Sequence, residues 1–400
     1  MGQYINLRQT ANPQFQHIIN KSTVFHYLRK NGPTYRNVIS SALGISLPTV
    51  TGALDSLTMA GFAELVEYRK NNQARRVPYY QITMKDSIIL SIDLLKNIIA
   101  TFDTSGINIM QNFTFPPDDD PEKRLLQIIN NFVRRKLKKE RSSIKSICIG
   151  FPGIVDVEKG MVIKAIYHPN LENIPFKQIL KEEYNCTVFI DNVVNLAAYA
   201  NYSEFNKIYK NIVSCDIGME IGTGLLINGT VYYGENYIAG EIGFYTDNLE
   251  NPAINFKRKY TFRALCAEFV KCHEGKIVDP AKLDVVFCLE KIAELFTLAH
   301  KKDKLVLKLV DTYIQNIALM LNKVEVLLNP KIIVISGDIC QIPYSEEVFL
   351  NPLNQYFKAV RLMAEDIKYS KYGSLVSVYG AGEMALDNYF SEEFPYVMGF

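Results

Sequence analysis

Residues 144–153 read Ile-Lys-Ser-Ile-Cys-Ile-Gly-Phe-Pro-Gly, an apolar run that ends in small residues. The same pattern returns at Thr187-Val-Phe-Ile-Asp-Asn192, Ile212-Val-Ser-Cys-Asp-Ile-Gly218 and Lys331-Ile-Ile-Val-Ile-Ser-Gly337. Each run is typical of a buried strand, and the helical patterns between them indicate an α/β fold. Because α/β proteins assemble ligand sites at such strand ends, we expect two lobes with a cleft between them.

Residues 1–85 differ from the rest of the chain in charge. They carry ten basic and three acidic side chains, a net charge of +7, which leaves −5 for residues 86–400 although the whole chain has only +2. A basic segment favours an anionic partner. We therefore expect a basic head with such a partner and a separate, mildly acidic body.

Three short helices are predicted in this basic head. Asn31-Gly-Pro33 ends the first, and the second, over about residues 35–43, is expected to bury Val38 and to end at Gly44. Ser46 can cap a third helix that has proline at its second position. The tight connection between the second and third helices is typical of a helix-turn-helix, whose later helix enters the major groove of DNA.

The third helix is followed by the pattern of a wing. Its own outward positions are small or polar, which lets the backbone approach base edges. Two alternating strands, residues 62–68 and 78–82, then flank a basic loop suited to phosphate. A trihelical packing module with a solvated loop is the alternative, but it does not require basic residues to gather here. We predict a winged helix-turn-helix domain over residues 1–85, which binds double-stranded operator DNA through Ser46, Pro48, Thr49, Thr51, Gly52, Arg69, Lys70, Arg75 and Arg76.

The composition excludes several classes of protein. No apolar run approaches the ~20 residues that span a bilayer, and residues 1–16 lack a signal-peptide core. The seven cysteines are scattered, which fits buried reduced thiols and not a disulfide framework. We expect a cytoplasmic protein with no membrane partner. A helix over about residues 122–140 ends in a basic run, which we interpret as a solvated helix end and not as a second nucleic-acid site.

Residues 87–390 resemble the ROK family, whose name covers repressors, open reading frames and sugar kinases. The resemblance rests on six pieces in a fixed order: Gly150-Phe-Pro-Gly-Ile-Val-Asp156, His168-Pro-Asn-Leu171, Asp191-Asn-Val-Val-Asn-Leu-Ala-Ala198, Gly218-Met-Glu-Ile-Gly-Thr-Gly-Leu-Leu-Ile-Asn-Gly229, Gly234-Glu-Asn-Tyr-Ile-Ala-Gly-Glu-Ile-Gly243 and Leu328-Asn-Pro-Lys-Ile-Ile-Val-Ile-Ser-Gly337.

The resemblance implies an α/β fold in which the winged helix-turn-helix precedes a two-lobed, actin-like ATPase (ROK) domain. This sensor domain should cover residues 86–400, with one lobe of about residues 86–200 plus the C-terminal helix and a second lobe of about residues 201–375. The whole chain then resembles a ROK-type transcriptional repressor, for which the family implies a homodimer or a higher homo-oligomer.

The chain departs from the family's kinases at three places. Their phosphate cradle starts with Asp and a Gly-Gly-Thr turn, whereas this chain has Asp93-Leu-Leu-Lys-Asn97, whose leucines obstruct the approach of phosphate. The position of the kinase base is Val193, which cannot accept a proton, and Asp191 would need a register slip to replace it. Met219 and Glu220 fill positions that kinases reserve for small residues. The sequence therefore predicts no catalytic residues and no enzyme.

Part of the family's sugar pocket is retained. The resemblance assigns sugar contacts to Gly153, Asn192 and Glu241, with Asn170 as a weaker candidate. Asparagine and carboxylate groups suit sugar hydroxyls because buried polar groups must be paired. Phe244 replaces the histidine that closes the family's zinc motif, and residues 245–265 contain no cysteine, so we predict no metal and no cofactor.

The leading prediction is a sugar-responsive repressor that has lost phosphoryl transfer. Its effector is expected to be a monosaccharide or a sugar phosphate. Because Val193 and Phe244 remove two polar contacts, we favour a ligand that is smaller than a hexose, such as a pentose, or partly apolar. An active ATP-dependent sugar kinase with a DNA-binding head, a regulator controlled by a protein partner, and a pocket that binds nothing are the alternatives.

Overall fold

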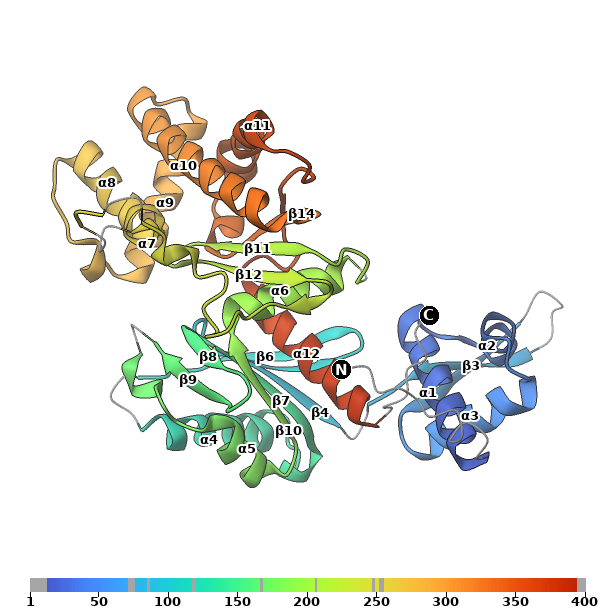
Figure 1. The fold of residues 1–400 in the computed structure, drawn as a ribbon. Coiled ribbons are helices and arrows are strands. Elements are labelled where there is room, and N and C mark those ends of the chain that lie inside the picture. The colour runs from blue at the N-terminus through green and yellow to red at the C-terminus, as the bar shows by residue number, and fades with distance from the viewer. Residues whose placement is uncertain are drawn as a thin grey trace.

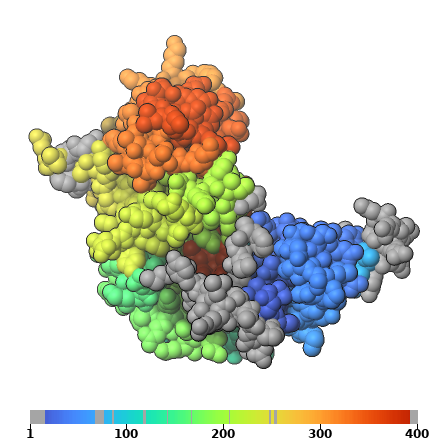
Figure 2. Space-filling view, turned by 45° about the vertical axis from the view of Figure 1, so that its right-hand side comes forward, coloured from blue at the N-terminus to red at the C-terminus, as the bar shows by residue number. Residues whose placement is uncertain are grey.

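The computed structural model describes residues 13–70, 76–84, 87–116, 120–165, 168–205, 207–246, 249–251 and 255–393. The chain forms a small head and a body of two stacked lobes (Figure 1). Figure 2 shows the head beside the body, with part of the C-terminal helix visible in the recess between them.

The head combines three helices with a three-stranded antiparallel sheet of order β1-β3-β2. Gly44, in the left-handed conformation, ends the second helix, and the Ser46 hydroxyl accepts a hydrogen bond from the Thr49 N–H and so caps the third. Because β2 pairs with β3 on either side of the basic loop, the sheet has the layout of a wing. The elements are α1 (Pro13–Asn31), β1 (Thr34–Tyr35), α2 (Arg36–Leu43), α3 (Leu47–Met59), β2 (Ala63–Lys70) and β3 (Arg76–Ile82).

One detail of the second helix was predicted wrongly. Val38 is 44% exposed, whereas its neighbour Ile39 is fully buried. One residue corresponds to a rotation of ~100° on a helix, so the inner face lies one position later than expected. Ile39 packs in one core with Val50 and Leu54 of α3.

The first lobe is built on a five-stranded sheet of order β10-β7-β4-β5-β6. Strands β4, β5 and β6 form an antiparallel meander, while β7 and β10 add to it in parallel. The expected helix over residues 122–140 is α-helical only to Asn131, continues as a π-helical turn over Phe132–Lys136 and ends there, before residue 140. The elements are β4 (Ile88–Asp93), β5 (Ile98–Asp103), β6 (Gly106–Asn112), α4 (Pro121–Asn131), β7 (Ile144–Phe151), β8 (Ile154–Asp156), β9 (Met161–Lys164), α5 (Phe176–Tyr184), β10 (Thr187–Asn192) and α6 (Val193–Glu204).

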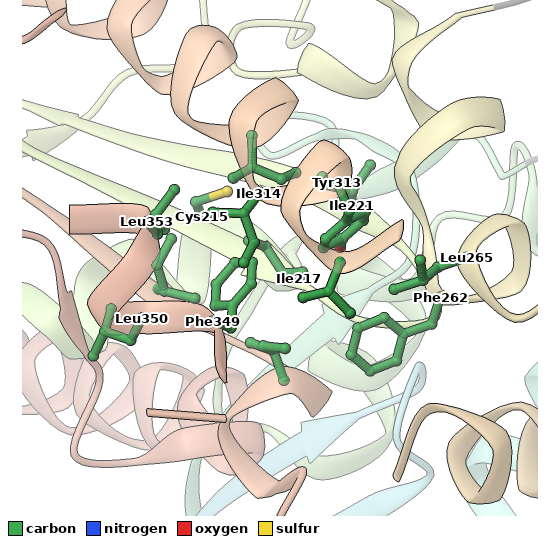
Figure 3. Packing of buried hydrophobic residues seen from close by; sticks show 14 of the residues in the cluster. Cys215, Ile217, Ile221, Phe262, Leu265, Tyr313, Ile314, Phe349, Leu350 and Leu353 are labelled. Atoms are coloured by element: carbon green, nitrogen blue, oxygen red, sulfur yellow. The ribbon is translucent and has the colours of Figure 1, made fainter. Parts of the chain in front are cut away.

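The second lobe repeats this plan. In the sheet order β13-β12-β11-β14-β15, the first three strands along the chain form an antiparallel meander and the last two add in parallel. Its core joins the sheet to the helices above it: Cys215 and Ile217 pack with Tyr313, Ile314 and Phe349 (Figure 3). The elements are β11 (Ile212–Ile217), β12 (Ile221–Ile227), β13 (Thr230–Val231), α7 (Phe256–Tyr260), α8 (Phe262–Glu274), α9 (Val285–His300), α10 (Lys304–Leu328), β14 (Ile332–Ser336), α11 (Asn351–Val360) and β15 (Lys368–Tyr369).

The last helix, α12 (Val376–Glu393), returns to the first lobe. It packs against α6 and over β4 and β7 (Figure 1). Its far end belongs to the same buried cluster as Phe25 and Leu28 of the head, through Leu386 and Phe390. Head and body therefore share a continuous core at α12. Among the helices of the described residues, none is long and apolar enough to cross a lipid bilayer.

Candidate ligand cleft and DNA-binding surface

The cleft lies where strand ends of both lobes converge. Asp93 ends β4, Asn192 ends β10, Asp216 lies near the end of β11, and Asp338 follows β14. The carboxyl ends of parallel strands meet at one edge of a sheet, and here the edges of two sheets face each other. They enclose a cavity of about 560 Å³. Gly153, Asn192 and Glu241, three of the four predicted ligand residues, all line it.

Asn192 caps a helix of the first lobe and contacts the second lobe across the cavity. Its side-chain oxygen accepts the Val194 N–H at 3.0 Å and so caps helix α6. Its side-chain nitrogen donates to the Glu241 carboxylate at 3.2 Å. Burial raises the pKa of Glu241, which the positive charge of Lys257 partly offsets. This pair offers one amide and one carboxylate to a ligand, the polar groups that bind sugar hydroxyls.

Gly153 shapes the wall of the cavity through its backbone. Its φ of +109° lies in a region that residues with a side chain rarely adopt. A Cβ atom there would collide with the Lys164 carbonyl and would lie 3.0 Å from the Cα of Ala165. The close approach of these two segments explains why the turn requires glycine, and it brings no side chain into the cavity at this position.

Asn170 does not line the cavity. Both polar atoms of its side chain are buried without a hydrogen-bond partner in the described part of the chain. Two of its neighbours, Ala165 and His168, do line the cavity, as do Val193 and Phe244. The side chain at the position of the kinase base is therefore apolar and faces the ligand space, so no proton acceptor stands at that position.

Asp191 is a buried carboxylate behind the cavity and is not part of its lining. Its Oδ1 atom accepts from the Asn195 side chain at 2.9 Å, and its Oδ2 atom accepts the Tyr233 hydroxyl at 2.7 Å. Burial raises the pKa of Asp191, and these hydrogen bonds lower it in part, so that it is about 6. Its oxygens accept hydrogen bonds from Asn195 of the first lobe and Tyr233 of the second, so Asp191 serves the structure behind the cleft.

Replacing Asp191 with asparagine should remove a pH dependence of stability. A carboxyl whose pKa is raised in the folded state favours folding at low pH, and this contribution is lost as the pH rises through the folded pKa. Relative to the Asp191→Asn variant, the unfolding free energy of the parent protein should fall by about 2 kcal/mol between pH ~4 and ~7. Chemical denaturation at several pH values measures it.

The Asp156→Asn variant is a control of opposite sign. Burial alone would raise the pKa of Asp156, but hydrogen bonds from Lys159 hold that pKa below its ordinary value. Relative to that variant, the parent protein should gain stability as the pH rises. Equal pH profiles for the parent protein and the Asp191→Asn variant would show that Asp191 has an ordinary pKa.

The hydrogen-bond donors of the turn after β4 are already paired with acceptors of the protein itself. The Leu94 N–H donates to the Gly150 carbonyl at 2.9 Å, and the Lys96 N–H donates to the Asp93 carboxylate at 2.7 Å. The Lys96 ammonium group crosses the cleft to the Asp338 carboxylate at 2.6 Å. Burial alone would lower the pKa of Lys96, but the negative charges of Asp338 and Asp216 raise that pKa above its ordinary value. A lysine of one lobe thus forms an ion pair with a carboxylate of the other.

Asp338 also occupies the glycine-rich loop of the second lobe. Its Oδ2 atom accepts the Met219 N–H at 3.1 Å, and a Cβ atom on Gly218 would collide with the same carboxylate. The second unusual residue of this loop, Glu220, forms an ion pair with Lys257. A carboxylate of the protein therefore accepts hydrogen bonds from a loop amide and a lysine, which are the kinds of donor that bind phosphate.

The predicted DNA-binding residues of the head lie at the start of α3 and in the wing. Ser46, Pro48 and Gly52 are exposed, and Thr49 and Thr51 are partly buried. A Cβ atom on Gly52 would meet no atom within 4 Å, so the backbone is open to an approaching duplex at this point. Arg69 and Lys70 are the last two residues of β2 and Arg76 is the first of β3, while Arg75 lies outside the described residues.

Two residues that join the lobes were missed by reasoning from the sequence. The sequence pattern marks Lys96 only as part of a turn that lacks glycine, and it does not single out Asp338. The available signal was a lysine and an aspartate that each directly follow a predicted strand end. Pairing them requires the arrangement of the two lobes, which no local pattern contains. Arg263 of α8, which also lines the cavity, had no such signal.

Comparison with known proteins agrees with this geometry. The chain is 28% identical over 244 residues to a protein of Caldicellulosiruptor bescii named xylose repressor, a match that covers 58% of this chain and 60% of that protein. It is 25% identical over 261 residues to a glucokinase of Halalkalibacterium halodurans, which covers 61% of this chain and 77% of that protein.

A solved structure has a similar fold over nearly the whole chain. It is described as a ROK family transcriptional regulator and a homologue of the Escherichia coli MLC protein, with a TM-score of 0.72 and 18% identity. The match covers 95% of this chain and 98% of that one, so it includes the head. The sequence pattern of the ROK family itself matches residues 95–388. With its two-lobed body and its cleft, the chain belongs to the ROK family.

Proposed function

We propose that the protein is a DNA-binding transcriptional repressor that a sugar controls from the cleft between the lobes, and that it catalyses no phosphoryl transfer. One observation carries this proposal: the Asn192–Glu241 pair lines the cavity, while the side chain next to it is Val193. The site therefore has groups that bind hydroxyls, whereas the position at which the family's kinases carry the base has an apolar side chain that cannot remove a proton.

The absence of catalysis is also supported by the phosphate side of the cleft. Phosphoryl transfer requires backbone amides and cations that are available to a nucleotide. Here the amides of Leu94 and Met219 already donate to groups of the protein, and Lys96 is paired with Asp338. A nucleotide would have to displace a carboxylate that holds both lobes.

A pentose is the effector that the cleft favours. Val193 and Phe244 give the cavity apolar surface where a larger, fully hydroxylated sugar would require polar partners. A relative that matches this chain over 60% of its own length is named a xylose repressor. We therefore choose D-xylose as the first sugar to test, with D-glucose and N-acetyl-D-glucosamine as larger alternatives.

The head supplies the DNA-binding half of the proposal. We assign residues 1–85 to DNA binding and residues 86–400 to the sensor. In a homodimer, two copies of α3 would enter the major groove at the half-sites of a near-palindromic operator. The basic residues of the wing, Arg69, Lys70, Arg75 and Arg76, would contact phosphates and make binding depend strongly on salt.

Selection from a random DNA library tests this function. The full-length protein should enrich one near-palindromic sequence, and its affinity for that duplex should fall at least ~10-fold between 50 and 200 mM salt. In parallel, the protein should form no sugar phosphate from ATP and each of the three sugars. Failure to enrich any sequence, even at low salt, would refute the repressor, and ATP-dependent phosphorylation would restore the kinase.

A further inference from the structure

Asp387, near the end of α12, joins the head to the body. The side chain is only 13% exposed. Its Oδ1 atom accepts a hydrogen bond from the Arg29 guanidinium group of helix α1 in the head. Its Oδ2 atom accepts from the Tyr199 hydroxyl of α6 and from the Lys207 ammonium group, the latter at 2.6 Å. One carboxylate thus has partners in three parts of the chain.

The contact on the head side is packed as well as charged. The Arg29 side chain is 18% exposed, and its guanidinium carbon lies 4.9 Å from the centre of the Phe390 ring on α12. The same ring lies 4.5 Å from the ring of Phe25, one turn before Arg29. The edge-to-face ring contact, the guanidinium group over the ring and the Arg29–Asp387 ion pair fix α1 to α12, so movement of Asp387 would move the head.

The contact on the body side leads to the ligand cavity. Tyr199 lies on helix α6, whose first turn carries the cavity-lining residues Val193 and Val194. Tyr199 is seven residues, or about two helical turns, after Asn192, the capping residue that binds Glu241. A helix is stiff over this length, so a shift at its first turn displaces the Tyr199 hydroxyl.

Helices α6 and α12 cannot move independently at their crossing. A Cβ atom on Gly380 would lie 2.5 Å from the carbonyl carbon of Leu196, so the two backbones are in direct contact there. Gly380 precedes Asp387 by seven residues on α12, the same spacing that separates Asn192 from Tyr199 on α6. The crossing and the carboxylate therefore lie about two turns apart on one helix.

The charges around Asp387 are nearly balanced. Burial alone would raise the pKa of Asp387, but the positive charges of Arg29 and Lys207 hold that pKa below its ordinary value. Glu383, one turn earlier, is a second acid, and the charge of Asp387 adds to the effect of burial in raising its pKa. Two acids and two bases share the site, so loss of one partner leaves a poorly solvated charge, which is costly.

We propose that Asp387 is the positioning residue through which the ligand cleft controls the head. A sugar that binds at Asn192 shifts the first turn of α6, and the shift reaches Asp387 through Tyr199 and through the crossing at Gly380. The carboxylate then holds Arg29 in a different place, which changes how the two heads of a dimer fit their half-sites. This inference rests on the proposed function, because it assumes that a sugar alters operator binding.

The Asp387→Asn variant tests the proposal through three separate measurements. These are the affinity for D-xylose by calorimetry, the affinity for the selected operator without sugar, and the ratio of operator affinities without and with sugar. Asparagine keeps the shape of the side chain but loses the charge that binds Arg29. We expect both affinities to stay within ~3-fold of the parent protein, while the ratio falls from ~10 or more toward 1.

Two further variants keep the test decisive. Tyr199→Phe keeps the ring and removes only the hydroxyl, so it should reduce the ratio in the same direction even if Asp387→Asn fails to fold. Arg141→Gln is the matched control, because Arg141 also pairs with a carboxylate, Glu183, and also lies over an aromatic ring, that of Tyr184, but within the body. It should leave the ratio unchanged.

The outcomes separate this inference from the proposed function. If the parent protein responds to sugar and both the Asp387→Asn and Tyr199→Phe variants respond equally well, Asp387 does not transmit the signal. If a variant loses sugar binding or operator binding to the same extent as it loses the ratio of operator affinities, the residue has a merely structural role. That result would also overturn the proposal. If the parent protein itself responds to none of the three sugars, the proposed function fails and this inference with it.

Discussion

The Gly380→Ala variant should be destabilised by about 3 kcal/mol or more, although alanine in a helix normally adds ~1 kcal/mol of stability over glycine. The added Cβ atom would collide with the carbonyl oxygen of Leu196 and lie 3.1 Å from its Cα atom. These are backbone atoms of α6, so no side-chain rotation relieves the contact. The whole helix would have to move, together with the cavity residues at its first turn.

Scanning calorimetry measures this effect as a lower midpoint of thermal unfolding, by about 6 °C or more. Gly52→Ala is the control for stability, because Gly52 also lies inside a helix but a Cβ atom there meets nothing within 4 Å. That variant should be as stable as the parent protein or slightly more stable. Equal stability of Gly380→Ala and the parent protein would mean that α6 and α12 are not in close contact.

The Glu241→Gln variant should bind D-xylose about 10- to 100-fold more weakly than the parent protein. A hydrogen bond to a charged group contributes ~1.5–3 kcal/mol, which corresponds to this range of affinity. Glutamine keeps an oxygen that can accept from the Asn192 side chain, so the wall of the cavity should be preserved. Titration calorimetry of both proteins with D-xylose gives the ratio of dissociation constants.

Glu204→Gln is the matched control for this change. Glu204 is also a partly buried carboxylate whose pKa burial raises, but it accepts from the Lys371 N–H and does not line the cavity. Its replacement should leave the affinity for D-xylose unchanged. If the two variants bind the sugar equally well, Glu241 is not a ligand residue and the sugar lies elsewhere in the cleft.

Much of the fold could be predicted because its signals are local. The strand runs, the glycine at the end of α2 and the cap at Ser46 depend on neighbouring residues, and each is found where expected. The family resemblance supplied what local patterns do not, the two-lobed fold of the body. Two expectations were wrong: the register within a short helix, at Val38 and Ile39, and the end of the helix expected over residues 122–140.

The contacts between distant segments could not be predicted. The ion pair of Lys96 with Asp338 joins residues that are 242 positions apart, and that of Arg29 with Asp387 joins residues 358 apart. Neither pair leaves a periodic pattern in the sequence, because each depends on how lobes and helices dock. The repeat of one strand order in both lobes was also not recognised, since the two halves do not share an evident sequence repeat.

The binding of the selected operator by the full-length protein, measured by fluorescence anisotropy during titration with D-xylose, tests the central claim most directly. The account predicts that saturating sugar weakens operator binding at least ~10-fold, which corresponds to a coupling free energy of about 1.4 kcal/mol. An operator affinity that stays the same at saturating D-xylose, D-glucose and N-acetyl-D-glucosamine would contradict it.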